Sequence, residues 1–215
     1  MDRESDISAR SAGSGAVAGA SSSMTSGSGS QVKTEQDPLD SRPLAATTKS
    51  LAAIKHLEEA VPAEVPEGLV LRYGVLYGHG ASDLMLEVVR KRQMPVLDGG
   101  TGIWSFTEVT DAAAATVAAV TKGAPGIYNV VDDEPAPVSQ WLPYLASSLG
   151  AKPPMRAPAW LGRLLGGEMI VSWMTEGRGA SNEKAKLELG WTPKYSSWRD
   201  GFPVWAEAFK SGPAA

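Results

Sequence analysis

The sequence contains no cysteine, only two histidines and no surplus of basic residues. Without cysteine there is no disulfide, no thiolate nucleophile and no cysteine-ligated zinc site. The two histidines, His56 and His79, are too few for a histidine-based metal centre, so we predict no bound metal. Twenty basic and 24 acidic residues give a net charge of −4. This charge argues against nucleic acid or anionic lipid as the main partner.

Long apolar runs are also missing. No run approaches the roughly 18 residues that a membrane-spanning helix needs. The N-terminus carries Asp2, Glu4 and Asp6 and lacks the apolar stretch of a signal peptide. We therefore expect a cytoplasmic protein with no membrane partner.

Small residues dominate the first 30 positions, which hold ten Ser, five Gly and five Ala. Such a segment buries too little apolar surface to offset the entropy of ordering it. We therefore predict a disordered tail over residues 1–31 and one folded domain over residues 32–210.

The remaining sequence alternates between helix and strand patterns, which indicates an α/β fold. Apolar residues at a spacing of three or four, together with capping residues, predict helices over 48–61, 83–92, 111–121, 139–149, 158–165, 182–189 and 198–209. Short, nearly continuous apolar runs predict strands over 69–77, 94–97, 103–109 and 126–130.

Two local expectations accompany these elements. Thr110 or Asp111 should cap the helix over 111–121, because short polar side chains accept hydrogen bonds from free backbone N–H groups. The run of carboxylates at 132–134 precedes Pro135 and reads as a solvated turn.

Neither glycine cluster completes a dinucleotide-binding fingerprint. Gly-x-Gly-x-x-Gly must follow a strand, so that the backbone can approach the pyrophosphate. The cluster at 78–80 has Asp83 in the third glycine position, and the cluster at 100–102 has Ser105 there. The Gly-x-Ser-x-Gly motif of a nucleophile elbow is also absent from the predicted domain.

Four stretches resemble the C-terminal half of the NAD-dependent epimerase/dehydratase family, which belongs to the extended short-chain dehydrogenases/reductases. They are LRYGVLYGHG at 71–80, WSFTEVTDAA at 104–113, GIYNV at 126–130 and ASNEKAKLELGWTP at 180–193. They occur in the order that this half of the family requires, and the resemblance covers about residues 32–205.

The resemblance implies a partial Rossmann-like parallel sheet and a mainly helical substrate-binding lobe. It also implies NAD or NADP as cofactor and a small or sugar-like molecule as substrate. The residues that it places beside the cofactor are Tyr73, Gly74, Val75 and Lys49, and those beside the substrate are Tyr77, Gly78, Trp104 and Arg72. Trp104 stands where nucleotide-sugar enzymes of the family often have an arginine against the diphosphate. This departure favours a smaller or more apolar substrate.

The Tyr-x-x-x-Lys pair that supplies acid/base chemistry in the family is absent, since no tyrosine here has a lysine four residues later. If Lys49 takes the place of the family lysine, Ala45 stands in the tyrosine position. If Lys55 does, Leu51 stands there. Either alignment lacks the phenol, so we predict no catalytic residue.

The first half of the family, with its glycine-rich turn, has no counterpart in residues 1–31. We therefore predict a truncated epimerase/dehydratase or reductase without autonomous catalysis, and we do not expect this chain alone to bind the cofactor. The alternative is a non-catalytic binding module, or a half-protein that pairs with a separate nucleotide-binding half. An unpaired sheet edge would favour association with that half or with a second copy as a homo-oligomer.

Overall fold

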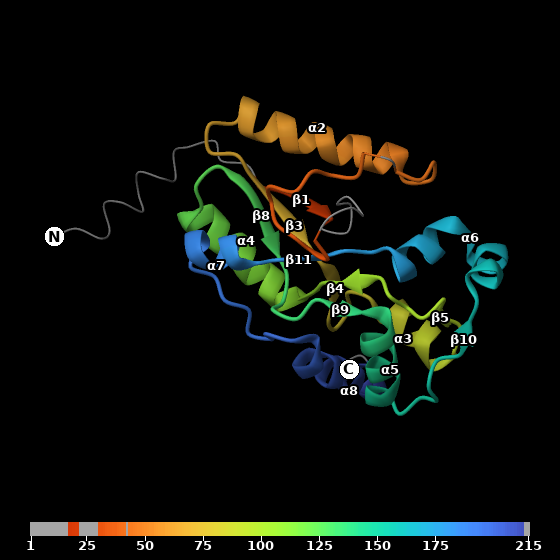
Figure 1. Ribbon diagram of the computed structural model, residues 1–215. Coiled ribbons are helices and arrows are strands. Elements are labelled where there is room, and N and C mark those ends of the chain that lie inside the picture. Colours follow the sequence, from red (N-terminus) through yellow and green to blue (C-terminus); the bar gives the residue numbers. More distant parts are fainter. Residues whose placement is uncertain (1–16, 22–29, 42, 213–215) are drawn as a thin grey trace.

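The computed structural model describes residues 17–21, 30–41 and 43–212. Figure 1 shows a parallel sheet that is flanked by helices, next to a lobe of helices and very short strands. This arrangement confirms the predicted α/β fold with a partial parallel sheet and a mainly helical lobe.

The parallel sheet has three strands in the order β1 (Val17–Ser21), β3 (Leu69–Tyr73) and β8 (Gly126–Val130). The central strand β3 is buried from Leu69 to Arg72. Burial on both faces explains its nearly continuous apolar sequence, since helices cover the sheet on each side.

Helix α2 (Thr48–Glu64) covers one face of this sheet, and α4 (Val109–Lys122) and α7 (Glu183–Leu189) cover the other (Figure 1). A first apolar core lies between the sheet and the α4–α7 face. Its fully buried members are Leu69, Leu71, Ala115, Ala119, Tyr128, Val130, Ala185, Leu189 and Trp191.

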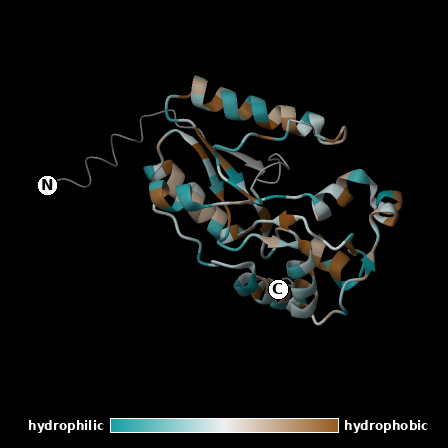
Figure 2. Cartoon of the chain, in the orientation of Figure 1, coloured by the Kyte–Doolittle hydropathy of each residue, from teal (hydrophilic) through white to brown (hydrophobic). Residues whose placement is uncertain are grey.

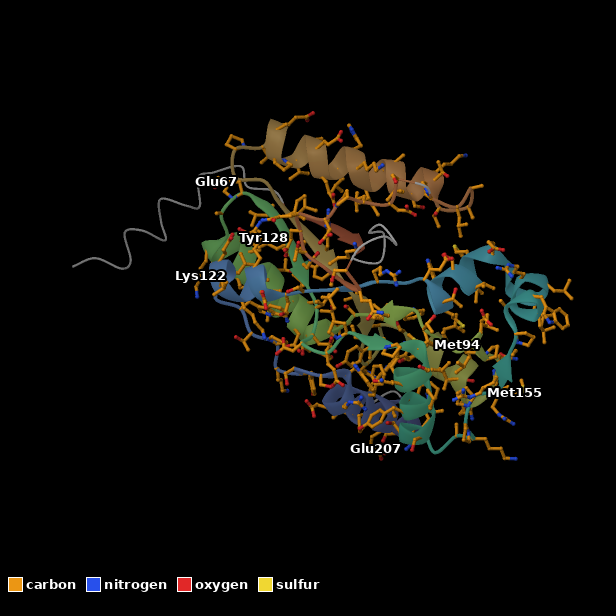
Figure 3. The ribbon with its side chains drawn as sticks, in the orientation of Figure 1. Glu67, Met94, Lys122, Tyr128, Met155 and Glu207 are labelled. Atoms are coloured by element: carbon orange, nitrogen blue, oxygen red, sulfur yellow. The ribbon has the colours of Figure 1, made fainter. Side chains whose placement is uncertain are left out.

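The helical lobe holds a second, larger core. Its helices are α3 (Asp83–Arg90), α5 (Val138–Ser148), α6 (Ala159–Thr175) and α8 (Trp198–Ser211). Its short strands form the pairs β4 (Val75–Tyr77) with β7 (Phe106–Glu108), β5 (Val96–Leu97) with β10 (Arg156–Ala157), and β6 (Ile103–Trp104) with β9 (Ala136–Pro137). Figure 3 shows Met94, Met155 and Glu207 on this lobe and Tyr128 and Lys122 on the side of the sheet.

The predicted disordered tail over 1–31 is wrong for Val17–Ser21, which form β1 and pair in parallel with β3. The small residues of this segment bury too little apolar surface to form a strand by themselves. Strand β3 supplies its backbone hydrogen bonds, and α2 and α4 both contact it, so tertiary pairing overrides local propensity. The tail's residues 1–16 and 22–29 lie outside the described part of the chain. Just after it, β2 (Val32–Lys33) pairs with β11 (Gly179–Ala180).

Several element ends differ from the predicted ones, and three of these differences have a clear local cause. Helix α2 continues past Pro62 to Glu64, because Val65 still donates its N–H to the Val61 carbonyl. Helix α6 runs ten residues beyond its predicted end, across a kink at Gly167, whose φ of 80° suits glycine. The cap of α4 is Glu108, which accepts from the N–H groups of Thr110 and Asp111, rather than either of those residues.

Within the described residues, no helix has the length and apolar character that crossing a membrane requires.

A buried ion pair joins α2 to the sheet. The Arg72 guanidinium donates from Nε and Nη2 to the two carboxylate oxygens of Glu58 at 2.6 and 2.7 Å. Both side chains are nearly buried, with 3% and 8% exposed. A bidentate pair in this setting fixes the helix on the strand, and losing either partner leaves an uncompensated buried charge.

We predict that Glu58→Gln lowers the free energy of unfolding by about 3–5 kcal/mol, because Arg72 then stays charged and buried without its counter-ion. Urea denaturation measures this change. The double variant Glu58→Leu/Arg72→Met should recover most of the loss, since it removes both charges together. The matched control is Glu168→Gln, which breaks the exposed Arg163–Glu168 pair and should cost less than about 1 kcal/mol. Equal losses for the buried and the exposed pair would contradict this role.

Candidate functional site

The three parallel strands end at one level. Ser21 of β1 lies opposite Tyr73 of β3, and Tyr73 lies opposite Val130 of β8. In open α/β sheets, ligands bind in the crevice outside the carboxyl ends of the strands. The candidate site is therefore this edge, where β3 passes into Gly74 and Val75.

The chain changes partners at this edge. The predicted strand over 69–77 is in fact two strands, because β3 pairs with β8 and β4 pairs with β7. Gly74 lies between them and donates its N–H to Thr107 Oγ1 at 3.0 Å, while Val75 donates to the Ser105 carbonyl at 2.8 Å. A Cβ at Gly74 would lie 2.6 Å from that same carbonyl oxygen, so only glycine fits. The backbone at the edge is thus held firmly.

The structure brings together the predicted cofactor-facing residues Tyr73, Gly74 and Val75. Tyr73 is half-buried, and its hydroxyl lies 2.7 Å from Thr116 Oγ1 on α4. Its phenol is therefore engaged with the helix rather than free for acid/base chemistry.

Lys49, the fourth predicted cofactor-facing residue, is exposed in the first turn of α2. Helix α2 contacts both β1 and β3, and Figure 1 shows that it begins on the side of the molecule where α6 lies. The alternative alignment through Lys55 places Leu51 in the tyrosine position, but Leu51 is only 2% exposed. Ala45, which the alignment through Lys49 puts in that position, is exposed and lies in the turn before α2.

The predicted substrate-side residues Tyr77 and Arg72 lie below the surface. Tyr77 is 1% exposed and packs edge-on against Phe202, with ring centroids 5.1 Å apart. Burial is the main cause that raises the pKa of Tyr77 well above its ordinary value, and the negative charge of Asp132 adds to it. Arg72 is held by Glu58 under α2. Both side chains support the site from inside the protein.

The other two predicted substrate-side residues are Gly78, which is also buried, and Trp104. Gly78 follows β4 with a φ of 126°, and a Cβ there would lie 2.6 Å from the Glu108 carboxylate. Trp104 is half-buried and donates its indole N–H to the Trp173 carbonyl at 2.9 Å. Its ring also lies 4.8 Å from that of Trp141, centroid to centroid, so it is fixed in position.

Carboxylates that follow the strands hold the C-terminal segment against the site. Asp111 accepts from the N–H groups of Lys194 and Tyr195 at 2.7 and 2.9 Å. Asp132 accepts from Trp198 N–H at 2.9 Å and so anchors the start of α8. We call Asp111 and Asp132 the carboxylate clamp.

The predicted solvated turn at 132–134 is wrong at its first residue, since Asp132 is 3% exposed. Burial raises the pKa of Asp132 from 3.8 to about 8, against the opposing effect of the hydrogen bond from Trp198. The only sign in the sequence is that Asp132 comes two residues after the end of β8, at the carboxyl edge of the sheet.

We predict that stability falls as pH rises from about 4 to about 8, the two pKa values of Asp132 in the unfolded and folded chain. In this window the folded protein keeps a proton that the unfolded chain has lost, so the free energy of unfolding decreases with pH. One such group contributes a slope of at most about 1.4 kcal/mol per pH unit. Asp132→Asn should reduce the slope, because its amide oxygen can still accept from Trp198 without titrating. Urea denaturation across this pH range measures the change.

Asp200→Asn, at an exposed carboxylate in the first turn of α8, is the control and should keep the slope of the original protein. An unchanged slope in Asp132→Asn would show that Asp132 is not the group that titrates.

No group of three or more His, Asp or Glu side chains suited to a metal ion occurs among the described residues. His56 and Glu59, one turn apart on α2, are both exposed.

A pocket of about 480 Å³ lies away from the carboxyl edge, beside β8. It is lined by Thr34, Glu35, Gln36, Ile127, Ser181, Glu183, Lys184, Leu187 and Glu188. Glu35 accepts from Asn129 N–H, and Lys184 donates to the Ile127 carbonyl. These side chains satisfy backbone groups of β8 that a further strand would otherwise use.

Comparisons with known proteins agree with this geometry. The sequence profile described as "NAD dependent epimerase/dehydratase family" matches residues 7–130. A protein from a Streptomyces species, named 3-diazoavenalumate denitrifying reductase, is 45% identical over 157 residues. That alignment covers 71% of this chain but 51% of the relative, so the chain spans about half the length of the curated protein that it matches.

Solved structures share the fold at low identity. A human epimerase family protein solved with NADPH has a TM-score of 0.73 at 18% identity. The match covers 94% of this chain and 69% of the human protein. A Thermotoga maritima UDP-glucose 4-epimerase solved with UDP-glucose has a TM-score of 0.69 at 20% identity. The match covers 92% of this chain and 63% of the epimerase. A protein of unknown function from Silicibacter pomeroyi has a TM-score of 0.71 at 22% identity, covering 95% and 69%.

Proposed function

The chain belongs to the NAD dependent epimerase/dehydratase family, and on this premise we propose that it forms the substrate-facing part of an NAD(P)-dependent reductase. The observation that carries the proposal is the common end of β1, β3 and β8, which leaves Gly74 and Val75 at the ligand-binding edge of a parallel sheet. The reductase relative, at 45% identity, supports an oxidoreductase rather than a purely structural role.

The residues at this edge suit the nicotinamide end of the cofactor. Gly74 has no side chain to obstruct a flat ring, Val75 offers an apolar contact, and Lys49 offers a cation to the ribose hydroxyls. Bound there, the nicotinamide would supply or accept a hydride. The pyrophosphate end does not fit the described residues, because none of their glycine clusters has the spacing that lets a backbone turn hold phosphates. A nucleotide-binding half must supply that turn.

The chemistry at this site would differ from that of a sugar epimerase. Ala45 takes the place of the family phenol, so no tyrosine there can withdraw a proton from a sugar hydroxyl. Trp104 would contact the substrate, whereas the buried residues Tyr77, Gly78 and Arg72 would position the backbone from beneath. We infer a reduction of a small molecule that does not draw on a tyrosine phenol.

A second candidate function is a non-catalytic module that pairs with a separate nucleotide-binding half. Among the described strands, β1 pairs only with β3, so one of its edges can accept a further parallel strand. Lack of any hydride transfer by the combined halves would favour this candidate.

We predict that this chain alone binds NADPH or NADH more weakly than the micromolar range, and that adding the nucleotide-binding half of the Streptomyces relative restores binding. Fluorescence titration of the reduced nicotinamide measures both. Lys49→Met should then weaken cofactor binding about tenfold, because a charged hydrogen bond to the ribose is worth about 1.5–3 kcal/mol.

Lys55→Met is the control, since Lys55 is also an exposed lysine on the same helix, and should leave the affinity unchanged. Micromolar binding of NADPH or NADH by this chain alone would refute the proposal that a separate half binds the phosphates. Equal effects of the two variants would refute the role of Lys49.

A further inference from the structure

Helix α6 exposes an unusual amount of apolar surface. Gly162, Val171 and Met174 are its buried residues, and the rest of the helix is also largely apolar. Its exposed large side chains are Trp160 (63%), Leu164 (75%), Leu165 (78%), Ile170 (36%) and Trp173 (38%). We call these five side chains the α6 apolar surface. A helix that is apolar all round normally has a partner on every side, so this surface is expected to be covered in the working protein.

The α6 apolar surface is continuous with the candidate site. Val75 at the sheet edge donates its N–H to the Ser105 carbonyl at 2.8 Å, and the next residue back along the chain is Trp104. The Trp104 indole in turn donates to the Trp173 carbonyl, and the two rings meet edge to face with centroids 6.5 Å apart. Ser105 and Trp104 therefore link the backbone at the sheet edge to the C-terminal part of α6.

This end of α6 is held rigidly. Gly102 donates its N–H to the Met174 carbonyl at 2.8 Å, and the Thr101 hydroxyl donates to the Thr175 carbonyl at 2.8 Å. A Cβ at Gly102 would lie 2.4 Å from the Trp173 carbonyl oxygen, so this close approach requires glycine. The two tryptophans thus form a preorganised wall, which lowers the entropy lost when a flat ligand binds.

The charges around α6 disfavour a nucleotide sugar. Its arginine, Arg163, is bound to Glu168 at 2.7 Å, and Asp98 and Glu176 add further negative charge around it. A diphosphate would have to displace one carboxylate and approach two more. An uncharged molecule avoids this repulsion, and planar rings pack well against indole faces.

We propose, building on the reductase function above, that the α6 apolar surface binds the substrate and selects uncharged, planar aromatic or conjugated molecules. Trp104 and Trp173 form its inner wall next to the nicotinamide edge. Trp160 and Leu164, one turn apart on the segment of α6 before the kink at Gly167, supply its outer part. Figure 2 shows apolar residues on α6 at the outer side of the lobe.

The test uses benzylideneacetone, an uncharged planar enone, as the probe and UDP-glucose as the comparison. Binding is measured on the full chain by saturation-transfer NMR and by quenching of tryptophan fluorescence. The enone should bind, and UDP-glucose should bind at least about tenfold more weakly. Tighter binding of UDP-glucose would overturn the proposal.

Variants of matched exposure locate the site. Leu164→Asn and Trp160→Ala should each weaken enone binding about tenfold, because each removes a large apolar contact. Leu187→Asn changes an equally exposed leucine, 83% exposed on α7, and should have no effect. Thermal unfolding of each variant confirms that it folds. Equal binding by Leu164→Asn and Leu187→Asn would refute the assignment.

Sedimentation velocity distinguishes a second copy of the chain as the occupant. A dimer that dissociates in Leu164→Asn would mean that α6 is a subunit interface, which would also overturn the proposal. Because the probe needs no cofactor, failure of the combined halves to bind a nicotinamide cofactor would refute the proposed function without changing the result for α6.

Discussion

The parallel register of β1, β3 and β8 is the constraint on which the site depends. Because the three strands end together, the chain must leave the sheet at Gly74, where only a residue without a side chain fits against Ser105. The switch of β3 to a new partner strand then carries the backbone into the lobe. The same crossing sets Val75 next to Ser105 and, through Trp104, next to α6. The sheet edge is therefore joined to the lobe through a short, hydrogen-bonded path.

Buried polar groups hold the surrounding layers onto this edge. The Arg72–Glu58 pair fixes α2, and with it the position of Lys49, while the carboxylate clamp fixes the segment that leads into α8. Each of these groups has lost its water, so each is stabilising only while its partner is in place. The site therefore rests on polar contacts that are sensitive to single substitutions and, at Asp132, to pH.

Much of this arrangement could be predicted from the sequence, for identifiable reasons. The apolar run at 126–130 and the spacing after Thr48 carry local signals, and the motif at 71–80 places Gly74 and Val75 at a sheet edge. Strand β1 could not be predicted, because its small residues have little strand propensity of their own. It forms because β3 supplies its backbone hydrogen bonds. The burial of Asp132 depends on α8 folding back over it, which no local pattern encodes. The motif around Tyr77 likewise predicts a site residue. Its burial depends on Phe202, which packs against it from a helix far along the chain.

The most direct measurement is the perturbation of backbone amide NMR signals of this chain by nicotinamide mononucleotide. This ligand carries the nicotinamide and its ribose but not the adenosine half, so it tests the edge independently of any phosphate-binding turn. If the carboxyl edge is the nicotinamide site, the amides of Gly74 and Val75 and those at the start of α2 shift in a saturable way. Shifts confined to the pocket beside β8, around Glu35 and Lys184, or no saturable shift at all, would contradict the assignment of the site.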